Sequence, residues 1–458
     1  MNKKSKIFLI CYPHLGVLDS WLPIVSEMSD MTDFSSFTLI IPNAMITRNF
    51  HMDNAIVNIS DSIFDSVLIR TYDKVWIKHT SVLNSINWYK NNHSILRLLD
   101  MSERLINRFT SPYLLARLLS FSCKKIFRKQ YKIKHEELNC TISKNDILFY
   151  DVATENNDTM TDILQLFENN NKYSLSHAIN LNEFKDPFTN IKNKSNIKVY
   201  IYRKKQIEYY KKTYGIDTDR IRVVGIPRHD QKWIEKIQEE NLKLPDFFNE
   251  NSILILTRHV SDVHCSFDEK IESLRSIKKI FIDRMGMTVI LKLHPSEKQE
   301  KIFLSKIETI YEDVFGSCNY GSTWVYSDMH ALSLAKEAKL VISLNTSVIF
   351  DIIVSGKPCV EYIDSSIGLK ESKKYKKKIT RFVQYGFIEG VSNYQELCVY
   401  VDRWISDPCQ ISISSTNAYK KYFPRFDGIS NKIATEILFE NKIRSTSGMK
   451  RVKTKKIT

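Results

Sequence analysis

Short runs of β-branched and other apolar residues recur along the chain, and polar or turn-forming residues follow each run. In the C-terminal half these runs lie at 253–256, 289–291, 340–343 and 359–362. Such runs, bounded by polar residues, are typical of strands that are buried on both faces of a parallel sheet. The pattern therefore predicts an α/β domain in this half.

The N-terminal half shows the same alternation of strands and helices. Strands are predicted at 7–12, 37–42, 66–69, 74–77, 146–150, 197–202 and 221–224, with helices at 21–28 and 204–214. The polar segment 245–252 interrupts the pattern and is the predicted linker. We expect domains at 1–244 and 253–410, a closing helical segment at 411–440 and a basic, disordered tail at 441–458.

A small polar cluster follows each of two predicted strands in the second domain. The clusters contain Lys292, His294 and Pro295 after one strand, and Asn345, Thr346 and Ser347 after the other. In an open α/β sheet, ligands bind at the carboxyl ends of strands, where helix N-termini offer free N–H groups. The two hydroxyls would precede a helix at 348–355 and could hold a phosphate, while the lysine and histidine could supply charge or a proton. The alternative is an ordinary N-cap and an ordinary strand end.

Two further residues of the second domain fit a nucleotide. Arg258 follows the strand at 253–256, and a guanidinium there is suited to a phosphate. Asp351 is the only acidic residue in the predicted helix 348–355, and its carboxylate is the candidate partner for a ribose.

These residues also carry a resemblance. KLHP at 292–295, followed by ISLNTSVIFDIIVSGKP at 342–358, resembles the nucleotide-binding half of bacterial surface-polysaccharide glycosyltransferases. That group includes capsule and O-antigen transferases, the sialyl- and polysialyltransferases with His-Pro and Ser-Ser motifs, and the CDP-glycerol glycerophosphotransferases. Thr346-Ser347 stands where the sialyltransferases have Ser-Ser. The resemblance implies the α/β fold called GT-B, with two Rossmann-like domains facing across a cleft and a C-terminal helix crossing back.

The resemblance also suggests acceptor-side residues in the first domain. The first strand-to-helix turn contains His14, Gly16 and Asp19, and it lacks the full GxGxxG pattern of dinucleotide-binding domains. The alternative is an ordinary turn, with Asp19 or Ser20 capping the helix that follows. Arg228 lies in GIPRHD at 225–230, which resembles the Gly-x-Pro-Arg-x-Asp segment of the same families.

Two residues are candidates for the catalytic base. Asp151 follows the strand at 146–150, at a place comparable to the base of bacterial sialyltransferases, although YDVATEN lacks the glycine of their motif. His177 lies in SLSHAIN at 174–180, which is similar to the His-Gly segment of surface-glycan transferases, with Ala178 in place of glycine. The sequence leaves both candidates open.

The composition indicates the kinds of partner and the cellular compartment that we expect. The 458 residues are 43% hydrophobic and carry a formal net charge of +15, which suits nucleic acid, anionic lipid or nucleotide phosphates. No nucleic-acid-binding module is evident, and the eight cysteines lack a CxxC pair or metal spacing, as in a reducing cytosol. No apolar run approaches a membrane span. The segment from Leu114 to Lys129 is apolar and basic at helical spacing, and it is either an anionic-membrane contact or a core-facing helix.

The leading hypothesis is an inverting, metal-independent glycosyltransferase without a cofactor, because cationic side chains and helix N-termini could stabilise the leaving group in place of a metal. It would use a CMP- or CDP-linked donor, with UDP- and GDP-sugars as alternatives, and a glycan or lipid-linked acceptor. Nucleic acid is not expected as a partner. The protein would be cytoplasmic and peripheral on the inner face of the membrane. The alternatives are a non-hydrolysing nucleotide-sugar 2-epimerase and a CDP-glycerol-type glycerophosphotransferase.

Overall fold

The structure is a computed structural model. It describes residues 5–13, 15–32, 36–44, 46–47, 50, 53–71, 76–92, 94, 96, 132–133, 138, 141–155, 157–176, 197–240, 251–261, 265–294, 297, 310–364, 380–423 and 427–441. His14, His177, Pro295, the segment 114–129 and most of the predicted linker lie outside these residues.

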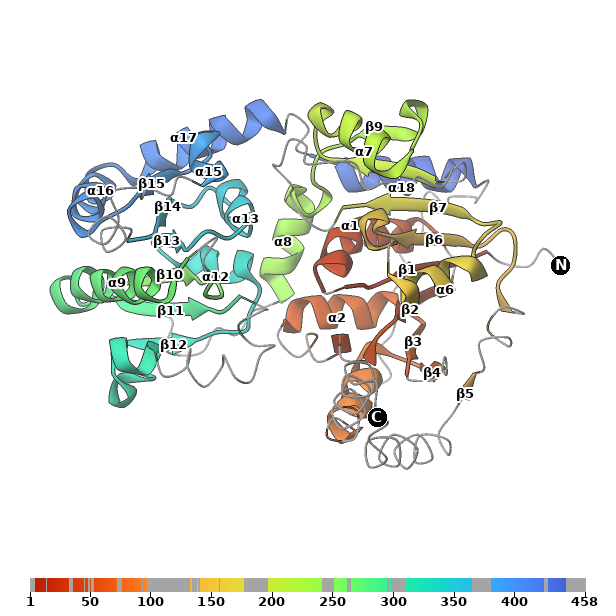
Figure 1. Ribbon diagram of the computed structural model, residues 1–458, viewed down its shortest axis with the longest axis horizontal. Coiled ribbons are helices and arrows are strands. Elements are labelled where there is room, and N and C mark those ends of the chain that lie inside the picture. Colours follow the sequence, from red (N-terminus) through yellow and green to blue (C-terminus); the bar gives the residue numbers. More distant parts are fainter. Residues whose placement is uncertain are drawn as a thin grey trace, which may run out of the picture. The chain divides into compact units, whose positions relative to one another are not determined.

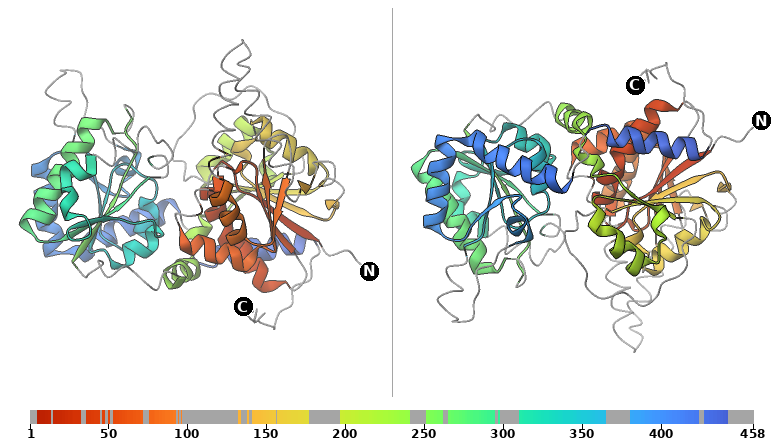
Figure 2. Two further views of the ribbon diagram at one scale, coloured as in Figure 1. Left: turned by 90° about the horizontal axis from the view of Figure 1, so that it is seen from below. Right: turned by 90° about the horizontal axis from the view of Figure 1, so that it is seen from above.

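The chain divides into two compact units. The first contains Met1–Asp230 and Asp427–Thr458, and the second contains Gln231–Phe426. Each unit is an α/β sandwich, with helices on both faces of a central sheet (Figures 1 and 2).

The first unit has a nine-stranded sheet in the order β5-β4-β3-β2-β1-β6-β7-β8-β9. β4 is antiparallel to β3 and β5, and the other pairs are parallel. The strands are β1 (Lys6–Ile10), β2 (Ser36–Ile41), β3 (Ser66–Arg70), β4 (Trp76–His79), β5 (Lys132–Ile133), β6 (Ile147–Tyr150), β7 (Asn171–Leu175), β8 (Ile197–Ile201) and β9 (Ile221–Val223). The order of the strands reverses at β1, which lies between β2 and β6.

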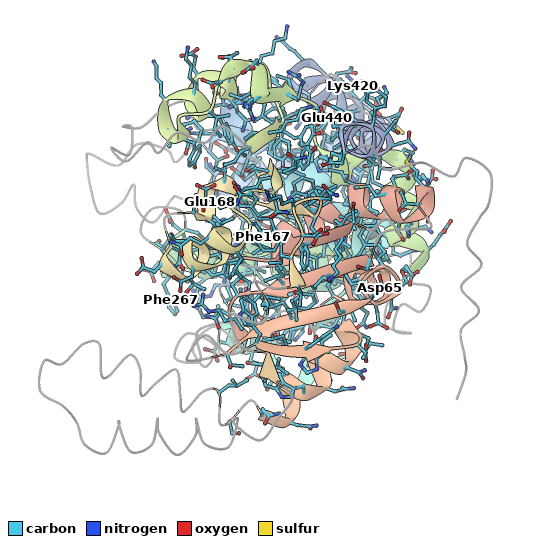
Figure 3. All side chains as sticks on the ribbon, turned by 90° about the vertical axis from the view of Figure 1, so that its right-hand side faces the viewer. Asp65, Phe167, Glu168, Phe267, Lys420 and Glu440 are labelled. Carbon is cyan, nitrogen blue, oxygen red and sulfur yellow. The ribbon has the colours of Figure 1, made fainter. Side chains whose placement is uncertain are left out.

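Apolar residues on alternate positions of these strands are buried under helices on both faces. On one face lie α6 (Asp158–Leu166) and α7 (Ile207–Tyr214). On the other, α1 (Leu15–Met31) packs against α2 (Asn54–Ile63) and α18 (Ile429–Glu440). Burial follows from this layering. Phe167 is buried in the core, and the next residue, Glu168, is exposed (Figure 3).

Helix α18 returns to the first unit, as the resemblance predicted. Asp230 accepts hydrogen bonds from the backbone N–H groups of Gly428 and Ser430, each at 3.1 Å, and thereby caps the start of the helix. Further along the helix, Asn431 donates to Glu27 of α1 at 3.1 Å. The closing helix is therefore held at its first turn and along its length.

The second unit has a six-stranded parallel sheet in the order β12-β11-β10-β13-β14-β15. The strands are β10 (Ser252–Leu256), β11 (Thr288–Lys292), β12 (Trp324–Tyr326), β13 (Leu340–Ser343), β14 (Cys359–Tyr362) and β15 (Glu389–Val391). The helices are α8 (Gln231–Glu240), α9 (Phe267–Ile277) with its π-helical continuation Lys278–Arg284, α12 (Ala331–Glu337), α13 (Ile349–Val354), α15 (Arg381–Gln384), α16 (Tyr394–Ser406) and α17 (Pro408–Tyr422). β10 lies where the order reverses, which is the arrangement of Rossmann-type sheets.

Two local predictions need correction, and one strand was missed. Helix α1 begins at Leu15, so Gly16 and Asp19 belong to its first two turns and not to a loop. The polar strand β7 was not predicted. Helix α13 has only six residues, and its N-cap is Val348. Among the described residues, no helix combines the length and the apolar character needed to cross a membrane.

Candidate functional site

Three strands of the second unit end at one level of the sheet. In the register of β10, Leu256 pairs with Lys292 of β11 on one side and with Ser343 of β13 on the other. The residues that follow these strands therefore gather at the carboxyl edge beside the point where the strand order reverses, which is where open α/β sheets bind ligands. We call this group the β10 edge site. It contains Arg258, His259, Lys292, His294, Asn345, Thr346 and Ser347.

One half of the β10 edge site is basic. The ring centroids of His259 and His294 lie 5.4 Å apart. The half-buried Arg258 has its pKa lowered by burial, and the charge of Glu297 acts in the opposite direction. Its Nε has no hydrogen-bond partner among the described residues. Lys292 Nζ donates to the carbonyl oxygen of Met329 at 2.5 Å. An anion at this edge would find three kinds of cationic or donor group.

A buried ion pair holds the backbone of the segment that contains His294. Glu297 and Lys270 of α9 are both fully buried and form a salt bridge. The carboxylate of Glu297 also accepts hydrogen bonds from the Thr257 hydroxyl, from the Tyr311 hydroxyl at 3.2 Å and from the backbone N–H of His294 at 2.7 Å. These contacts join the ends of β10 and β11 through one side chain and fix the backbone at His294.

Glu297 is ionised in this network. Burial alone raises the pKa of the carboxyl group, but the charge of Lys270 and the hydrogen bonds from Lys270, Thr257 and His294 outweigh it, so the pKa lies below its ordinary value. Sequence reasoning missed both members of the pair. The available signal was an acidic residue three positions after His294, but its cation lies on another helix.

The other half of the β10 edge site is the turn after β13. Asn345 has a φ of 59°, a left-handed conformation that few residues other than glycine adopt. The backbone N–H of Thr346 donates to the hydroxyl of Ser343 at 3.3 Å. Neither Thr346 nor Ser347 caps α13, because its N-cap is Val348 and no side-chain cap bond is present. Asp351, the predicted ribose partner, lies in the first turn of α13 and is only 4% exposed.

The first unit has a corresponding edge where its strand order reverses between β1 and β6. Asp151 directly follows β6 and is 1% exposed. Its carboxylate accepts a hydrogen bond from the backbone N–H of Ala153 at 2.9 Å and caps the short 3₁₀ turn Val152–Thr154. The hydroxyl of Ser174, near the end of β7, accepts from Val152 N–H at 2.8 Å. The predicted base is thus a buried residue at the carboxyl edge of the sheet.

The acceptor-side candidates lie around a tyrosine that sequence reasoning missed. Arg228 and Asp19 form an ion pair at 3.5 Å, with side chains 10% and 15% exposed. The buried Tyr202, just after β8, donates to the carbonyl oxygen of Ser176. Burial raises the pKa of Tyr202, and the charges of Arg228, Asp151 and Asp19 all act on the same phenol. The structure therefore brings Asp151, Asp19 and Arg228 together at one edge.

Helix α1 is tied to this edge by its own side chains. The indole N–H of Trp21 donates to the carbonyl oxygen of Tyr150 at 3.1 Å, and the indole stacks on Phe149 with centroids 4.5 Å apart. Gly16 contributes its carbonyl oxygen to the hydroxyl of Ser20 at 2.8 Å. These contacts set the position of Asp19 relative to the end of β6.

No model of a known protein family matches the sequence, and no curated protein matches it. Several solved structures share its fold. One is MnaA of S. aureus in complex with UDP, with a TM-score of 0.53, 11% identity, and 96% of this chain and 97% of that chain covered. Another is the UDP-GlcNAc 2-epimerase of Neisseria meningitidis bound to UDP-GlcNAc, with a TM-score of 0.51, 12% identity and coverage of 95% and 100%. The wall teichoic acid polymerase TagF, soaked with CDPG, has a TM-score of 0.51, 12% identity and coverage of 96% and 90%. The chain therefore has an α/β two-domain fold of the GT-B type.

Proposed function

We propose that this protein is an inverting glycosyltransferase, which moves a sugar from a nucleotide donor to a glycan or lipid-linked acceptor of a bacterial surface polysaccharide. The observation that carries the proposal is the β10 edge site, where basic side chains and a left-handed turn meet at the reversal point of a Rossmann-type sheet. This edge is the usual position of a nucleotide phosphate in such sheets. The proposal assigns the donor to the second unit and the acceptor to the first.

In this proposal the basic side chains stabilise the leaving group. An acceptor hydroxyl loses its proton to Asp151 or His177 and attacks the anomeric carbon of the donor. The bond from that carbon to the phosphate oxygen breaks, and the nucleotide leaves with the electron pair. Arg258, His294 and Lys292 would hold the developing charge, and the His294 imidazole would protonate it. These cations would take the place of a metal ion.

A nucleotide-activated donor is supported by the partners of the structural neighbours. Those proteins were captured with UDP, UDP-GlcNAc and CDPG. We rank cytidine donors first, because one imidazole can stabilise and protonate the single phosphate with which a CMP-linked sugar leaves. A CDP-linked glyceryl donor is the neighbouring possibility, which the likeness to TagF favours.

The alternative is a nucleotide-sugar 2-epimerase. One of the structures with the same fold is a UDP-GlcNAc 2-epimerase, whose chain is covered in full. An epimerase would convert its nucleotide sugar in the absence of any acceptor, whereas a transferase needs one. Incubation with UDP-GlcNAc alone, followed by NMR of the sugar ring protons, separates the two functions. Appearance of an epimer would overturn the transferase proposal.

The donor site is tested by thermal stabilisation with CMP, CDP, UDP and GDP. Loss of a charge-assisted phosphate contact costs about 1.5–3 kcal/mol, so His294→Ala and Ser347→Ala should weaken nucleotide binding roughly ten- to a hundredfold. Ser406→Ala, an exposed hydroxyl on α16, is the matched control and should bind as the native protein does. Unchanged binding in both site variants would contradict the phosphate site. Preference for UDP or GDP would overturn the donor ranking alone.

A further inference from the structure

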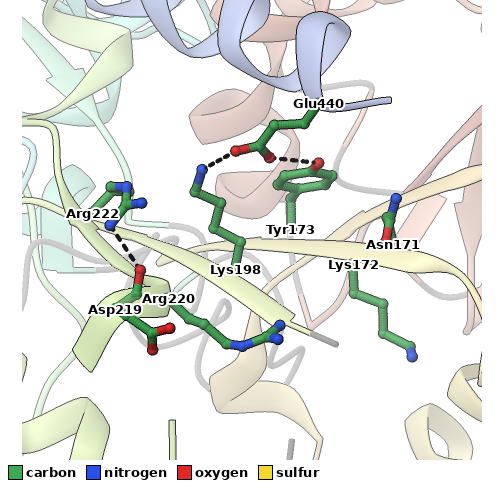
Figure 4. A pocket seen from close by; sticks show the side chains of 8 residues that line it. All are labelled: Asn171, Lys172, Tyr173, Lys198, Asp219, Arg220, Arg222 and Glu440. Atoms are coloured by element: carbon green, nitrogen blue, oxygen red, sulfur yellow. Dashed lines mark hydrogen bonds and ion pairs between the residues drawn. The ribbon is translucent and has the colours of Figure 1, made fainter. Parts of the chain in front are cut away.

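A polar pocket of about 340 Å³ opens at the amino ends of β7, β8 and β9 in the first unit (Figure 4). Its lining includes four cationic side chains, Lys172, Lys198, Arg220 and Arg222, and two acidic ones, Asp219 and Glu440. The volume lies near the lower end of the range for small-molecule sites, about 300–1,000 Å³. Asp151 and Tyr202 lie at the carboxyl ends of the same sheet, so this pocket is separate from the candidate site.

Two of the four cations have a structural task. Lys198 forms salt bridges with Glu436 and, at 2.5 Å, with Glu440 of α18. The Nε of Arg222 lies 3.8 Å from a carboxylate oxygen of Glu436. Glu440 also accepts a hydrogen bond from the Tyr173 hydroxyl at 3.0 Å. These contacts neutralise Lys198 and Arg222 and hold the end of α18 on the sheet.

Neither of the other two cations forms a salt bridge with a described residue. The half-buried guanidinium of Arg220 makes no hydrogen bond or ion pair with any of them. Lys172 Nζ donates only to the carbonyl oxygen of Glu168, at 2.9 Å. Burial lowers the pKa of Lys172, and the charges of Glu155 and Glu168 act in the opposite direction. In Figure 4 both cationic side chains extend on the side of the strands away from Glu440.

The remaining lining groups indicate what kind of anion fits. Asp219 is exposed at the pocket, and its carboxylate would repel a bare anion but accept hydrogen bonds from hydroxyl groups. A sugar ring that carries an acidic group satisfies both requirements. We propose that this pocket binds an acidic sugar unit, with its anionic group between Arg220 and Lys172 and its hydroxyls on Asp219. The inference goes beyond the proposed transferase activity and does not depend on it.

The test is a calorimetric titration of the full chain with four probes. A hyaluronan tetrasaccharide carries carboxylates and glucose 6-phosphate carries a phosphate, while maltotetraose is neutral and inorganic phosphate has no ring. We expect one or both acidic sugars to bind, more weakly as salt is raised, because salt screens exposed charges. Equal binding of maltotetraose would overturn the role of the charge. Equal binding of inorganic phosphate would overturn the role of the sugar.

Variants locate the binding in the pocket. Arg220→Ala and Lys172→Gln should each weaken binding of the acidic sugar about tenfold or more, and Arg220→Lys should retain part of it. Lys211→Gln removes one exposed charge from α7, outside the pocket, and should bind as the native protein does. Circular dichroism and the thermal midpoint establish that each variant is folded. Undiminished binding by folded Arg220→Ala, or no binding of any acidic sugar to the native protein, would overturn the proposal.

Discussion

Glu297 and Lys270 show how a fully buried ion pair can serve a site without touching its ligand. Removing one partner of such a pair leaves an uncompensated buried charge, which typically costs about 3–5 kcal/mol. We therefore expect Lys270→Met to lower the thermal midpoint of the second unit by roughly 6–20 °C, at about 2–4 °C per kcal/mol. Scanning calorimetry measures this shift.

The double variant with Glu297→Gln is the control for this prediction. It removes both charges and should recover a large part of the lost stability, because replacing a whole buried pair is often close to neutral. Equal midpoints for the single and double variants would contradict the account of Glu297 as an ionised carboxylate that needs its cation.

Glu361 is a second buried carboxyl group, and its pKa is raised where that of Glu297 is lowered. It lies on β14, and its Oε1 accepts a hydrogen bond from the Thr380 hydroxyl, while Oε2 has no partner among the described residues. Burial raises its pKa to about 7. The folded protein therefore keeps a proton that the unfolded chain releases above its ordinary pKa of 4.5. Stability is unaffected below that value and falls as pH rises toward 7, by about 3 kcal/mol in total.

Glu361→Gln should remove this pH dependence. The variant should unfold near the native temperature at pH 4.5 and about 6–12 °C above it at pH 8, by the same conversion of free energy to temperature. Scanning calorimetry across this pH range gives the difference between the two proteins. Glu312→Gln serves as the control, because Glu312 is an exposed residue of the same unit. Parallel profiles for native protein and Glu361→Gln would contradict the raised pKa.

At the scale of elements, the sequence was sufficient to predict the bounds of strands that are buried on both faces. The predicted bounds of β13 and β14 agree with the structure to the residue, because both are short apolar runs between polar residues. β7 was missed because it begins with Asn171 and Lys172, and its buried Ser174 has a hydrogen-bonding task. The start of α1 was placed too late, because Ser20 was a possible cap but its hydroxyl instead bonds back to Gly16 within the helix.

The same strand pattern predicts that the candidate residues gather at one edge of the sheet, but it does not indicate the contacts that hold them there. Residues such as His294 and Asn345 follow strands, so the parallel register brings them to one edge. The salt bridge between Lys270 and Glu297 joins residues 27 positions apart on different elements, and no local pattern indicates it. Tyr202 was missed similarly, since its role depends on charges from α1, from the residue after β6 and from the segment after β9.

Helix α18 offers a test of how an element from the chain's end is held. Asp230 caps its first turn from a distant part of the sequence. Loss of such a cap typically costs about 1–2 kcal/mol, so Asp230→Ala should raise amide exchange in the first turns of α18 by roughly five- to thirtyfold. Hydrogen exchange with mass spectrometry measures this locally. Asp219→Ala, which removes an exposed carboxylate of the same unit, should leave α18 protected, and equal exchange in both variants would contradict the cap.

At the scale of the whole molecule, the net charge of +15 requires an explanation that no single site gives. The segment from Leu114 to Lys129 lies outside the described residues, but its sequence combines seven large apolar residues with five basic ones. Each basic residue near an anionic bilayer contributes about 1 kcal/mol, in addition to the burial of apolar side chains. A lipid-linked acceptor would place the substrate of the proposed transferase at that surface.

We therefore predict that the protein floats with anionic liposomes and that high salt reduces its recovery. Replacing Lys124, Lys125, Arg128 and Lys129 by glutamine should lower binding by about 4 kcal/mol, which would release most of the protein. The matched control replaces four exposed lysines elsewhere by glutamine, and it has the same net charge as the first variant. These lysines are Lys204, Lys205, Lys211 and Lys212. If both variants lose binding equally, the attraction belongs to the net charge and not to this segment. If the native protein stays with the soluble fraction, membrane association is wrong for this protein.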